Sequence, residues 1–288
     1  MEVYIKMKKI AALALALMLL GSLAACQKAD SGQGDVLTVA LSPDFSPMEF
    51  VDTSKSGQEQ FVGFDITLAN HIAQELGKTL EIKPMSFDAC QTAVQMGTVD
   101  MSISGFSWTA EREENYLISD YYIAGDNETE QVIITTVTDA QSGAFTTAES
   151  YAGLKVAAQA ASLQEKLCQE ALPEDTEIVL FKDINDAVLA LQTGKVNAVA
   201  VADGNADAII ANNPDVAKSG FQFDVDPKYE NNVILLNKED QELLEQVNAI
   251  LADCMAKDLY TGWYDAAKEL AGIETAADIA YDDEGNAQ

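Results

Sequence analysis

The sequence predicts an α/β fold of two lobes, each built on a mostly parallel sheet flanked by helices. β-rich segments alternate with amphipathic helical segments along the chain, an order that is typical of parallel sheets. One helix–glycine–strand unit also occurs twice, as AVQMGTVDMSISG from Ala93 and as ALQTGKVNAVAVA from Ala190. This repeat indicates two similar lobes. The alternative is a chance similarity between two copies of a common helix–strand unit.

The first 25 residues have the pattern of a bacterial signal peptide. Lys6, Lys8 and Lys9 precede the apolar run IAALALALMLL, which is too short to span a bilayer. The run leads into LAAC, which resembles a lipobox, so Cys26 is expected to carry lipid as the first residue of the mature chain. Ordinary secretory cleavage is the alternative. Residues 26–35 are small and polar, as in a flexible tether.

The segments after the tether alternate between strand and helix patterns. VLTVAL from Val36 and TLEIKPM from Thr79 are β-rich, whereas helices are expected from Asp65 to Leu76 and from Asp88 onward. The family resemblance described below implies two segments that cross between the lobes, and with them the chain is expected to divide into lobe 1 over residues 36–127 and 234–272, lobe 2 over residues 128–233, and an acidic tail over residues 273–288.

The repeated unit also locates a cleft. In each copy a glycine, Gly97 or Gly194, suits the left-handed position that ends a helix. The alignment then places Gly105 and Asp203 near the carboxyl ends of equivalent strands, where open α/β sheets bind ligands. If the two lobes face each other, Arg112 and Asp203 are expected to lie on opposite sides of the cleft between them.

Arg112 is in an unusual place for a cation. It follows the N-cap candidate Thr109, and the positive end of a helix disfavours cations by about 0.3–1 kcal/mol. Free N–H groups and a guanidinium together can bind a small carboxylate, and Asp203 could accept an ammonium group, so the pair describes an α-amino acid. The alternatives are an N-cap role for Asp203 and a surface ion pair of Arg112 with a neighbouring glutamate, Glu111, Glu113 or Glu114.

Composition argues against several other classes of function. The chain has 47 Asp plus Glu against 17 Lys plus Arg, so nucleic acid and anionic lipid surfaces are poor partners. Cys90, Cys168 and Cys254 have no C-x-x-C spacing, which predicts buried free thiols, with one disulfide at most, and no metal site. The one histidine, His71, falls beside an apolar helical stripe and is expected at the surface. No nucleophile, phosphate-loop or zinc-protease motif occurs, so neither catalysis nor a cofactor is expected.

These segments together resemble the extracytoplasmic amino-acid-binding proteins of ABC importers. The family is that of the family 3 solute-binding proteins, which include glutamine-binding and lysine/arginine/ornithine-binding proteins. The resemblance runs from about Leu37 to Ala271 and rests on FSPMEF, GFDITLANHIAQELG, GTVDMSISGFSWTAEREENYLISDYY and GLKVAAQAASLQEKL in that order. It implies a monomeric, two-lobed periplasmic-binding-protein type II (Venus flytrap) fold, with crossing segments near YIAGDNETEQV and YENNVILL.

The resemblance also assigns seven residues to the ligand site. Two aromatic rings sandwich the ligand side chain, other groups meet the ammonium group, and a third set binds the carboxylate. In that order they are Phe45 and Phe87; the carbonyl of Gly105 and the acid of Asp203; and Arg112 with Ser162 and the backbone N–H that follows it. The seventh residue, Ser107, matches the hydroxyl residue of the family's site. For both phenylalanines, ordinary core packing is the alternative.

The chain departs from the family pattern around the ligand side chain. Many members have aspartate at the position of Ser42, and a lysine or a glycine-rich turn in place of QAAS, Gln159 to Ser162. Asp44 and Glu49 lie near the expected sandwich and could also be solvated rim residues. Ser42, Asp44, Glu49 and Gln159 are therefore the candidates for specificity, and the ligand is expected to have a polar or basic side chain.

The resemblance implies a lipid-anchored protein on the outer face of the cell membrane, or a periplasmic one where an outer membrane is present. It would deliver a free L-α-amino acid to a permease with ATPase subunits. Two other functions are compatible with the same fold. One is an enzyme similar to cyclohexadienyl dehydratase, and the other is a ligand-sensing subunit of a membrane receptor.

Overall fold

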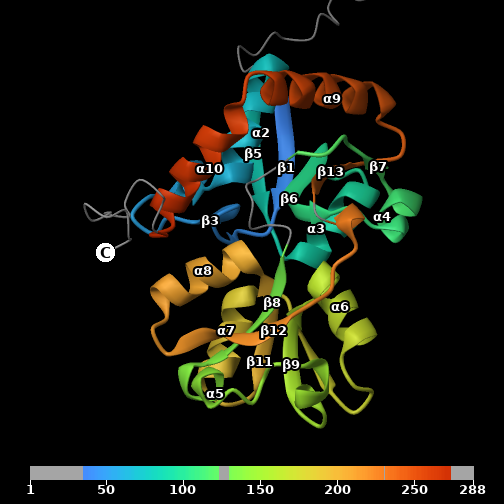
Figure 1. Ribbon diagram of the computed structural model, residues 1–288. Coiled ribbons are helices and arrows are strands. Elements are labelled where there is room, and N and C mark those ends of the chain that lie inside the picture. Colours follow the sequence, from blue (N-terminus) through green and yellow to red (C-terminus); the bar gives the residue numbers. More distant parts are fainter. Residues whose placement is uncertain (1–34, 123–129, 230, 274–288) are drawn as a thin grey trace, which may run out of the picture. The chain divides into compact units, whose positions relative to one another are not determined.

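The computed structural model describes residues 35–122, 130–229 and 231–273 (Figure 1). The signal peptide, Cys26, nearly all of the tether and the tail from residue 274 lie outside the described residues. So do residues 123–129 of the first expected crossing segment. The contacts below belong to the compact unit that begins at Val36.

The first large sheet combines strands from both ends of the chain. Its strands are β1 (Val36–Leu41), β5 (Thr79–Pro84), β6 (Met101–Ser107), β7 (Leu117–Ile118) and β13 (Asn232–Leu236), in the order β5-β1-β6-β13-β7. β1 is parallel to β5 and β6, and β13 is antiparallel to β6 and β7. All but β13 therefore run in one direction, and the lobe boundary expected at residue 234 falls inside β13.

The second large sheet has the same plan. Its strands are β8 (Gln131–Thr136), β9 (Lys155–Gln159), β10 (Glu177–Phe181), β11 (Ala198–Ala202) and β12 (Val216–Gln222), in the order β10-β9-β11-β8-β12. β9 is parallel to β10 and β11, whereas β8 is antiparallel to β11 and β12. The repeated sequence supplies the middle strand of each sheet, β6 and β11, and the predicted fold class is confirmed.

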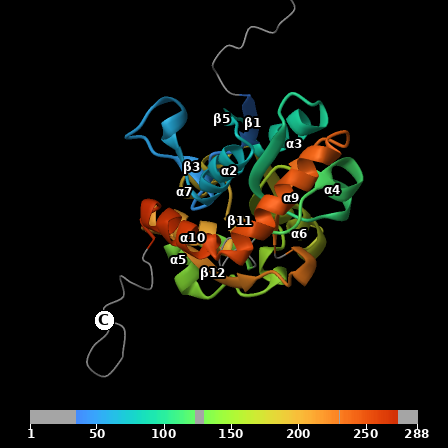
Figure 2. The ribbon, with the colours of Figure 1, turned by 90° about the horizontal axis from the view of Figure 1, so that it is seen from above.

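Helices cover both faces of the first sheet (Figures 1 and 2). These helices are α2 (Phe64–Glu75), α9 (Gln241–Ala256) and α10 (Leu259–Leu270) on one face, and α3 (Phe87–Gln95) with α4 (Ala110–Asn115) on the other. Side chains alternate along a strand, so Leu37 and Val39 of β1 pack in the core with α2, while Ala40 packs with α3. A small sheet of β2 (Asp44–Phe45), β3 (Glu49–Val51) and β4 (Phe61–Val62) adjoins this lobe.

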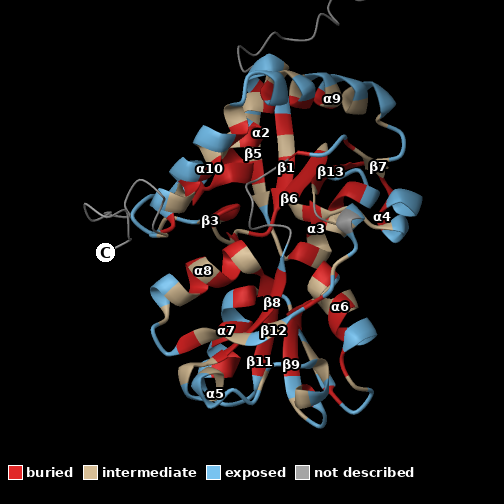
Figure 3. Cartoon of the chain, in the orientation of Figure 1, coloured by how far each residue is buried: buried red, intermediate tan, exposed pale blue. Residues whose placement is uncertain are grey.

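The second sheet is covered in the same way. Its helices are α5 (Val137–Ser142), α6 (Leu163–Ala171), α7 (Ile184–Gln192) and α8 (Asp203–Asn212). Short 3₁₀ helices occur in both parts of the described chain, at η1 (Gly57–Gln60), η3 (Ala148–Tyr151) and η4 (Pro227–Tyr229). Val199 and Val201 of β11 pack in the core with α7 and α8, while Ala198 and Ala200 pack with α6. Figure 3 shows buried strands beneath helices with exposed outer sides. Burial on both faces explains why the central strand β11, AVAVA, is a continuous apolar run.

Several local predictions can be compared with the structure. Gly97 and Gly194 have φ angles of 63° and 71°, which confirms the left-handed helix ends. Thr109 is confirmed as the N-cap of α4, because its Oγ1 accepts a hydrogen bond from the backbone N–H of Arg112 at 3.1 Å. The exposed position expected for His71 is wrong. The imidazole is half-buried, with its centroid 5.2 Å from that of Trp263, because α10 packs against α2.

The three cysteines of the described chain are buried free thiols, as predicted. Burial raises the pKa of Cys168 to about 12 and that of Cys254 to about 11, so both are protonated at neutral pH. Among the described residues, no helix is long and apolar enough to cross a membrane. The same residues contain no cluster of three or more His, Cys, Asp or Glu side chains suited to a metal ion.

Candidate ligand site between the two sheets

The candidate site is a cavity of about 20 Å³ between the carboxyl end of β6 and the amino end of α6. Its lining comes from both large sheets and their helices: Phe45, Phe87, Ser104, Gly105, Ser107, Arg112, Gln159, Ser162, Leu163 and Gln164. Six of the seven residues assigned by resemblance therefore lie together, and Gln159 joins them. Ser104 and Gln164 were not predicted; Ser104 immediately precedes Gly105, and this adjacency was the available signal.

The backbone at Gly105 allows the close approach of Phe45. Gly105 has a φ of 55°, and a Cβ atom there would lie 2.7 Å from Cε1 of Phe45. Any larger residue would therefore push the ring away as well as strain the backbone. Phe45 also packs against the core clusters of both large sheets, so its ring bridges the two lobes.

Phe87 is both a cavity residue and a core residue. Its ring stacks on Phe106 with centroids 4.6 Å apart, and only 7% of Phe87 is exposed. The guanidinium carbon of Arg112 lies 5.5 Å from the Phe87 centroid and 5.2 Å from the Phe106 centroid. The two rings therefore hold the guanidinium by cation–π contact, and the core-packing alternative for Phe87 describes part of its role.

Arg112 is the single arginine of the chain and is 5% exposed. Its Nη1 donates to the carbonyl of Ser107 at 2.6 Å, and its Nη2 donates to the carbonyl of Ala161 at 3.0 Å. Burial lowers its pKa to about 10, so it remains charged at neutral pH. The ion pairs of the described residues do not include Arg112, and the surface-pair alternative is therefore wrong.

The turn before α6 supplies the groups that face Arg112. Ala161 has a φ of 62°, a left-handed conformation that is uncommon for a residue other than glycine. Its carbonyl also accepts from Nε2 of Gln91 at 3.3 Å, and its N–H donates to Oε2 of Glu165 at 2.7 Å. Ser162 is the N-cap of α6, since its Oγ accepts from the N–H of Glu165. A ligand carboxylate at Arg112 would take the place of the Ala161 carbonyl.

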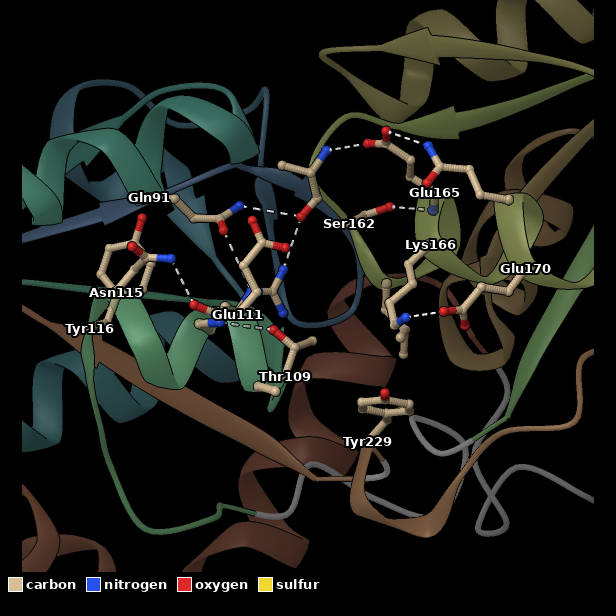
Figure 4. A pocket seen from close by; sticks show the side chains of 15 residues that line it. Gln91, Thr109, Glu111, Asn115, Tyr116, Ser162, Glu165, Lys166, Glu170 and Tyr229 are labelled. Atoms are coloured by element: carbon tan, nitrogen blue, oxygen red, sulfur yellow. Dashed lines mark hydrogen bonds and ion pairs between the residues drawn. The ribbon is translucent and has the colours of Figure 1, made fainter.

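A larger groove of about 670 Å³ opens beside this cavity, between α4 and α6 (Figure 4). Glu111 and Asn115 come from α4, and Glu165 and Lys166 from α6, with Tyr229 at one side. The groove shares Arg112, Ser162 and Leu163 with the cavity, but it lacks the two phenylalanines. We place the site in the cavity because the aromatic, cationic and backbone groups converge there. A space of about 20 Å³ holds one water, so ligand entry requires the lining groups to separate.

Of the seven residues assigned by resemblance, Asp203 is the one that does not line the cavity. Its carboxylate pairs with Nζ of Lys218 at 2.7 Å, and the same ammonium group lies 2.6 Å from Asp207. Its backbone N–H donates to the carbonyl of Glu130. The role of Asp203 as acceptor for a ligand ammonium group stays a prediction, and it would require exchange of Lys218 for the ligand.

Glu49 lies outside the cavity lining in a buried carboxyl pair with Asp65, so the solvated-rim alternative is wrong and a role in specificity stays a prediction. Its Oε1 accepts from the hydroxyl of Ser104, while Oδ2 of Asp65 accepts from the N–H of Gly105 at 2.8 Å and from the hydroxyl of Tyr122 at 3.1 Å. Burial raises the pKa of Asp65 to about 7, and burial followed by the charge of Asp65 raises the pKa of Glu49. Both carboxyl groups therefore bind a proton more readily than they would in water.

This pair predicts a fall in stability as pH rises. A carboxyl group with a raised pKa binds its proton more tightly in the folded protein, so its contribution is present at acid pH and is lost as pH rises through about 7. For Asp65 the loss of unfolding free energy between pH 5 and pH 8 should be on the order of 2–3 kcal/mol. Urea unfolding at both pH values measures it. The variant Asp65→Asn should depend less on pH, and an equal dependence would contradict the assignment.

The other two specificity candidates also lie outside the cavity lining. The hydroxyl of Ser42 donates to Oδ1 of Asp44 at 2.7 Å, and both residues are buried. Asp44 contacts the second lobe because β2 packs against α7, so the alternative of a solvated residue at the rim of the cleft is wrong. Of the four candidates, Gln159 alone faces the cavity directly.

Two sheets of one plan, with the buried Arg112 and aromatic rings at a cavity between them, are typical of a two-lobed binding protein. The chain belongs to the bacterial extracellular solute-binding proteins, family 3, whose family model matches residues 37–266. It is thus a substrate-binding protein of an amino acid ABC transporter.

Individual relatives agree with this membership. The arginine-binding extracellular protein ArtP of Bacillus subtilis is 26% identical over 86% of this chain and 92% of its own. The histidine-binding periplasmic protein of Escherichia coli is 26% identical over 78% and 84%. The solved structure of AbpA from Streptococcus pneumoniae, bound to L-arginine, is 31% identical with a TM-score of 0.75, over 83% of this chain and 97% of its own. These relatives are binding proteins and not enzymes, and so is this chain.

Proposed function

We propose that the protein captures free L-arginine, or a related amino acid with a basic side chain, in the cavity between its lobes. One observation carries the proposal: the guanidinium of Arg112 is buried at the cavity and bonds to the carbonyls of Ser107 and Ala161 instead of an acid. A buried cation is costly unless an anion accompanies it. The α-carboxylate of an amino acid supplies that anion and can bind both arms of the guanidinium.

Three features support a basic side chain. Phe45 and Phe87 line the cavity, where an aromatic ring can contact a cation or a planar group, and Gln159 adds a polar group to the same cavity. The net charge of −30 attracts cationic solutes. ArtP and AbpA are described with arginine as their ligand. The captured amino acid would pass to a permease with ATPase subunits, and the protein would act as a monomer.

Binding should be visible as thermal stabilisation of the mature protein. L-arginine at a thousandfold excess over Kd should stabilise the fold by about 4 kcal/mol, whereas L-arginine methyl ester should give little shift because it lacks the carboxylate. A melting panel of the twenty amino acids with this ester measures both. Equal shifts for acid and ester would rule out the carboxylate site, and no shift with arginine would rule out the proposed ligand.

The membrane attachment proposed through Cys26 has its own test. A lipid on the Cys26 thiol would hold the protein on the outer face of the cell membrane, and residues 26–35 would separate the anchor from the cleft. Cys26→Ser should therefore release the protein into the soluble fraction with unchanged ligand affinity. Fractionation followed by immunoblotting decides, and continued membrane association of the variant would contradict the anchor.

A further inference from the structure

Asp44 connects the two lobes beside the cavity. It lies in β2, next to the first large sheet, and is 7% exposed. Its Oδ2 accepts from the backbone N–H of Ile184 at 2.7 Å, at the start of α7, and from Nε2 of Gln159 at 2.9 Å, at the end of β9. Both donors belong to the second lobe, so one carboxylate oxygen joins a helix end and a cavity residue of the opposite lobe.

These bonds fix the orientation of the Gln159 amide. Nε2 also donates to the carbonyl of Lys182 at 3.3 Å, so both hydrogens of the amide nitrogen have acceptors among residues that do not line the cavity. The polar atom that remains is Oε1, which can only accept a hydrogen bond. Gln159 lines the cavity, and Oε1 is the group that it has left for a ligand.

We propose that Asp44 is a positioning residue for ligand selection, because it holds the Gln159 amide so that its oxygen is presented to the ligand. The cavity then favours amino acids whose side chains carry N–H donors, such as a guanidinium, over those that end in an acceptor. This inference rests on the proposed function, since it requires the ligand to enter this cavity.

The charge state of Asp44 is suited to this role. Burial raises its pKa to about 6, with a smaller contribution from the charge of Asp183, while the bonds from Ser42, Ile184 and Gln159 lower it. At neutral pH the group is mainly a carboxylate, which accepts hydrogen bonds and cannot donate one to the Gln159 oxygen. A neutral amide at this position has a donor and an acceptor, and therefore permits either orientation of Gln159.

The substitution Asp44→Asn tests the inference with two ligands of equal length. L-arginine carries only donors at its side-chain end, whereas L-citrulline carries a carbonyl oxygen there. The wild type should bind arginine more tightly, and the ratio of the two dissociation constants should fall about tenfold in Asp44→Asn, as expected when a hydrogen bond to a charged group is lost. Titration calorimetry measures both constants.

Asp183→Asn is the matched control, because Asp183 caps the same helix through the N–H of Asn185 and does not bond to Gln159 in the described contacts. Its ratio should equal that of the wild type. Gln159→Met should lower the ratio as Asp44→Asn does, and the double variant should lower it no further, since both changes remove one effect.

The outcomes separate the inference from the proposed function. An unchanged ratio in Asp44→Asn, with arginine still bound, overturns the positioning role. If Asp44→Asn does not fold, as judged by circular dichroism, Gln159→Met decides, and an unchanged ratio there overturns the inference equally. A wild-type protein that binds neither arginine nor citrulline contradicts the proposed function itself.

Discussion

Arg112→Lys should nearly abolish ligand binding, although it keeps the positive charge. A guanidinium can bind both oxygens of a carboxylate and is held in its plane by Phe87 and Phe106, whereas an ammonium group is a point charge on a mobile stem. Loss of one partner of a desolvated ion pair costs about 2–5 kcal/mol, which is roughly a thirtyfold to several thousandfold loss of affinity. Titration calorimetry with L-arginine measures it.

The control for this substitution is Glu111→Gln on the same helix. Glu111 lines the outer groove, and the described ion pairs do not join it to Arg112. The Glu111→Gln variant should therefore bind the ligand with an affinity close to that of the wild type. The unfolding free energy of ligand-free Arg112→Lys should be measured in parallel. Wild-type affinity in Arg112→Lys would falsify the assignment of the carboxylate site.

Phe87→Ala should destabilise the ligand-free protein by about 3–5 kcal/mol as well as weaken binding. The ring is 7% exposed, stacks on Phe106 and packs in one cluster with Val94 and Val99. Removing it leaves a cavity in the core and takes away one contact of the Arg112 guanidinium. Urea unfolding without ligand, followed by titration with L-arginine, separates the two effects.

Phe87→Leu is the matched variant, because leucine keeps most of the apolar volume and loses the ring face. It should cost less than about 1.5 kcal/mol of stability, as conservative core changes do. Unchanged stability of Phe87→Ala together with a large loss of affinity would mean that this ring faces the ligand and not the core.

The local elements were predictable because short-range patterns specify them. The helix expected from Asp65 to Leu76 appears as α2, and the left-handed φ angles of Gly97 and Gly194 follow from the absence of a side chain at the helix end. The N-cap at Thr109 follows from a hydroxyl three residues before a free N–H. Each of these local features depends on residues only a few positions apart in the sequence, so it can be predicted without the tertiary structure.

Most of the residues that gather at the cavity were predicted by the family resemblance, whereas the repeated unit predicted a meeting of Arg112 and Asp203 that the structure does not show. The resemblance named Phe45, Phe87 and Arg112 as one site, and the structure brings them to one cavity. Sequence order alone would not bring them together, because the strand order of the first sheet, β5-β1-β6-β13-β7, differs from the order of these strands along the chain.

The sequence by itself therefore determined the local elements, the family and most of the side chains around the cavity. Only the tertiary structure decided the partners of the polar groups. Asp203 pairs with Lys218, Glu49 is held beside Asp65, and Asp44 reaches residues 115 and 140 positions away in the other lobe. The physical reason is the short distance over which hydrogen bonds and ion pairs form. A carboxylate accepts any suitable donor within about 3 Å, and which donors come that close is set by how helices and sheets pack.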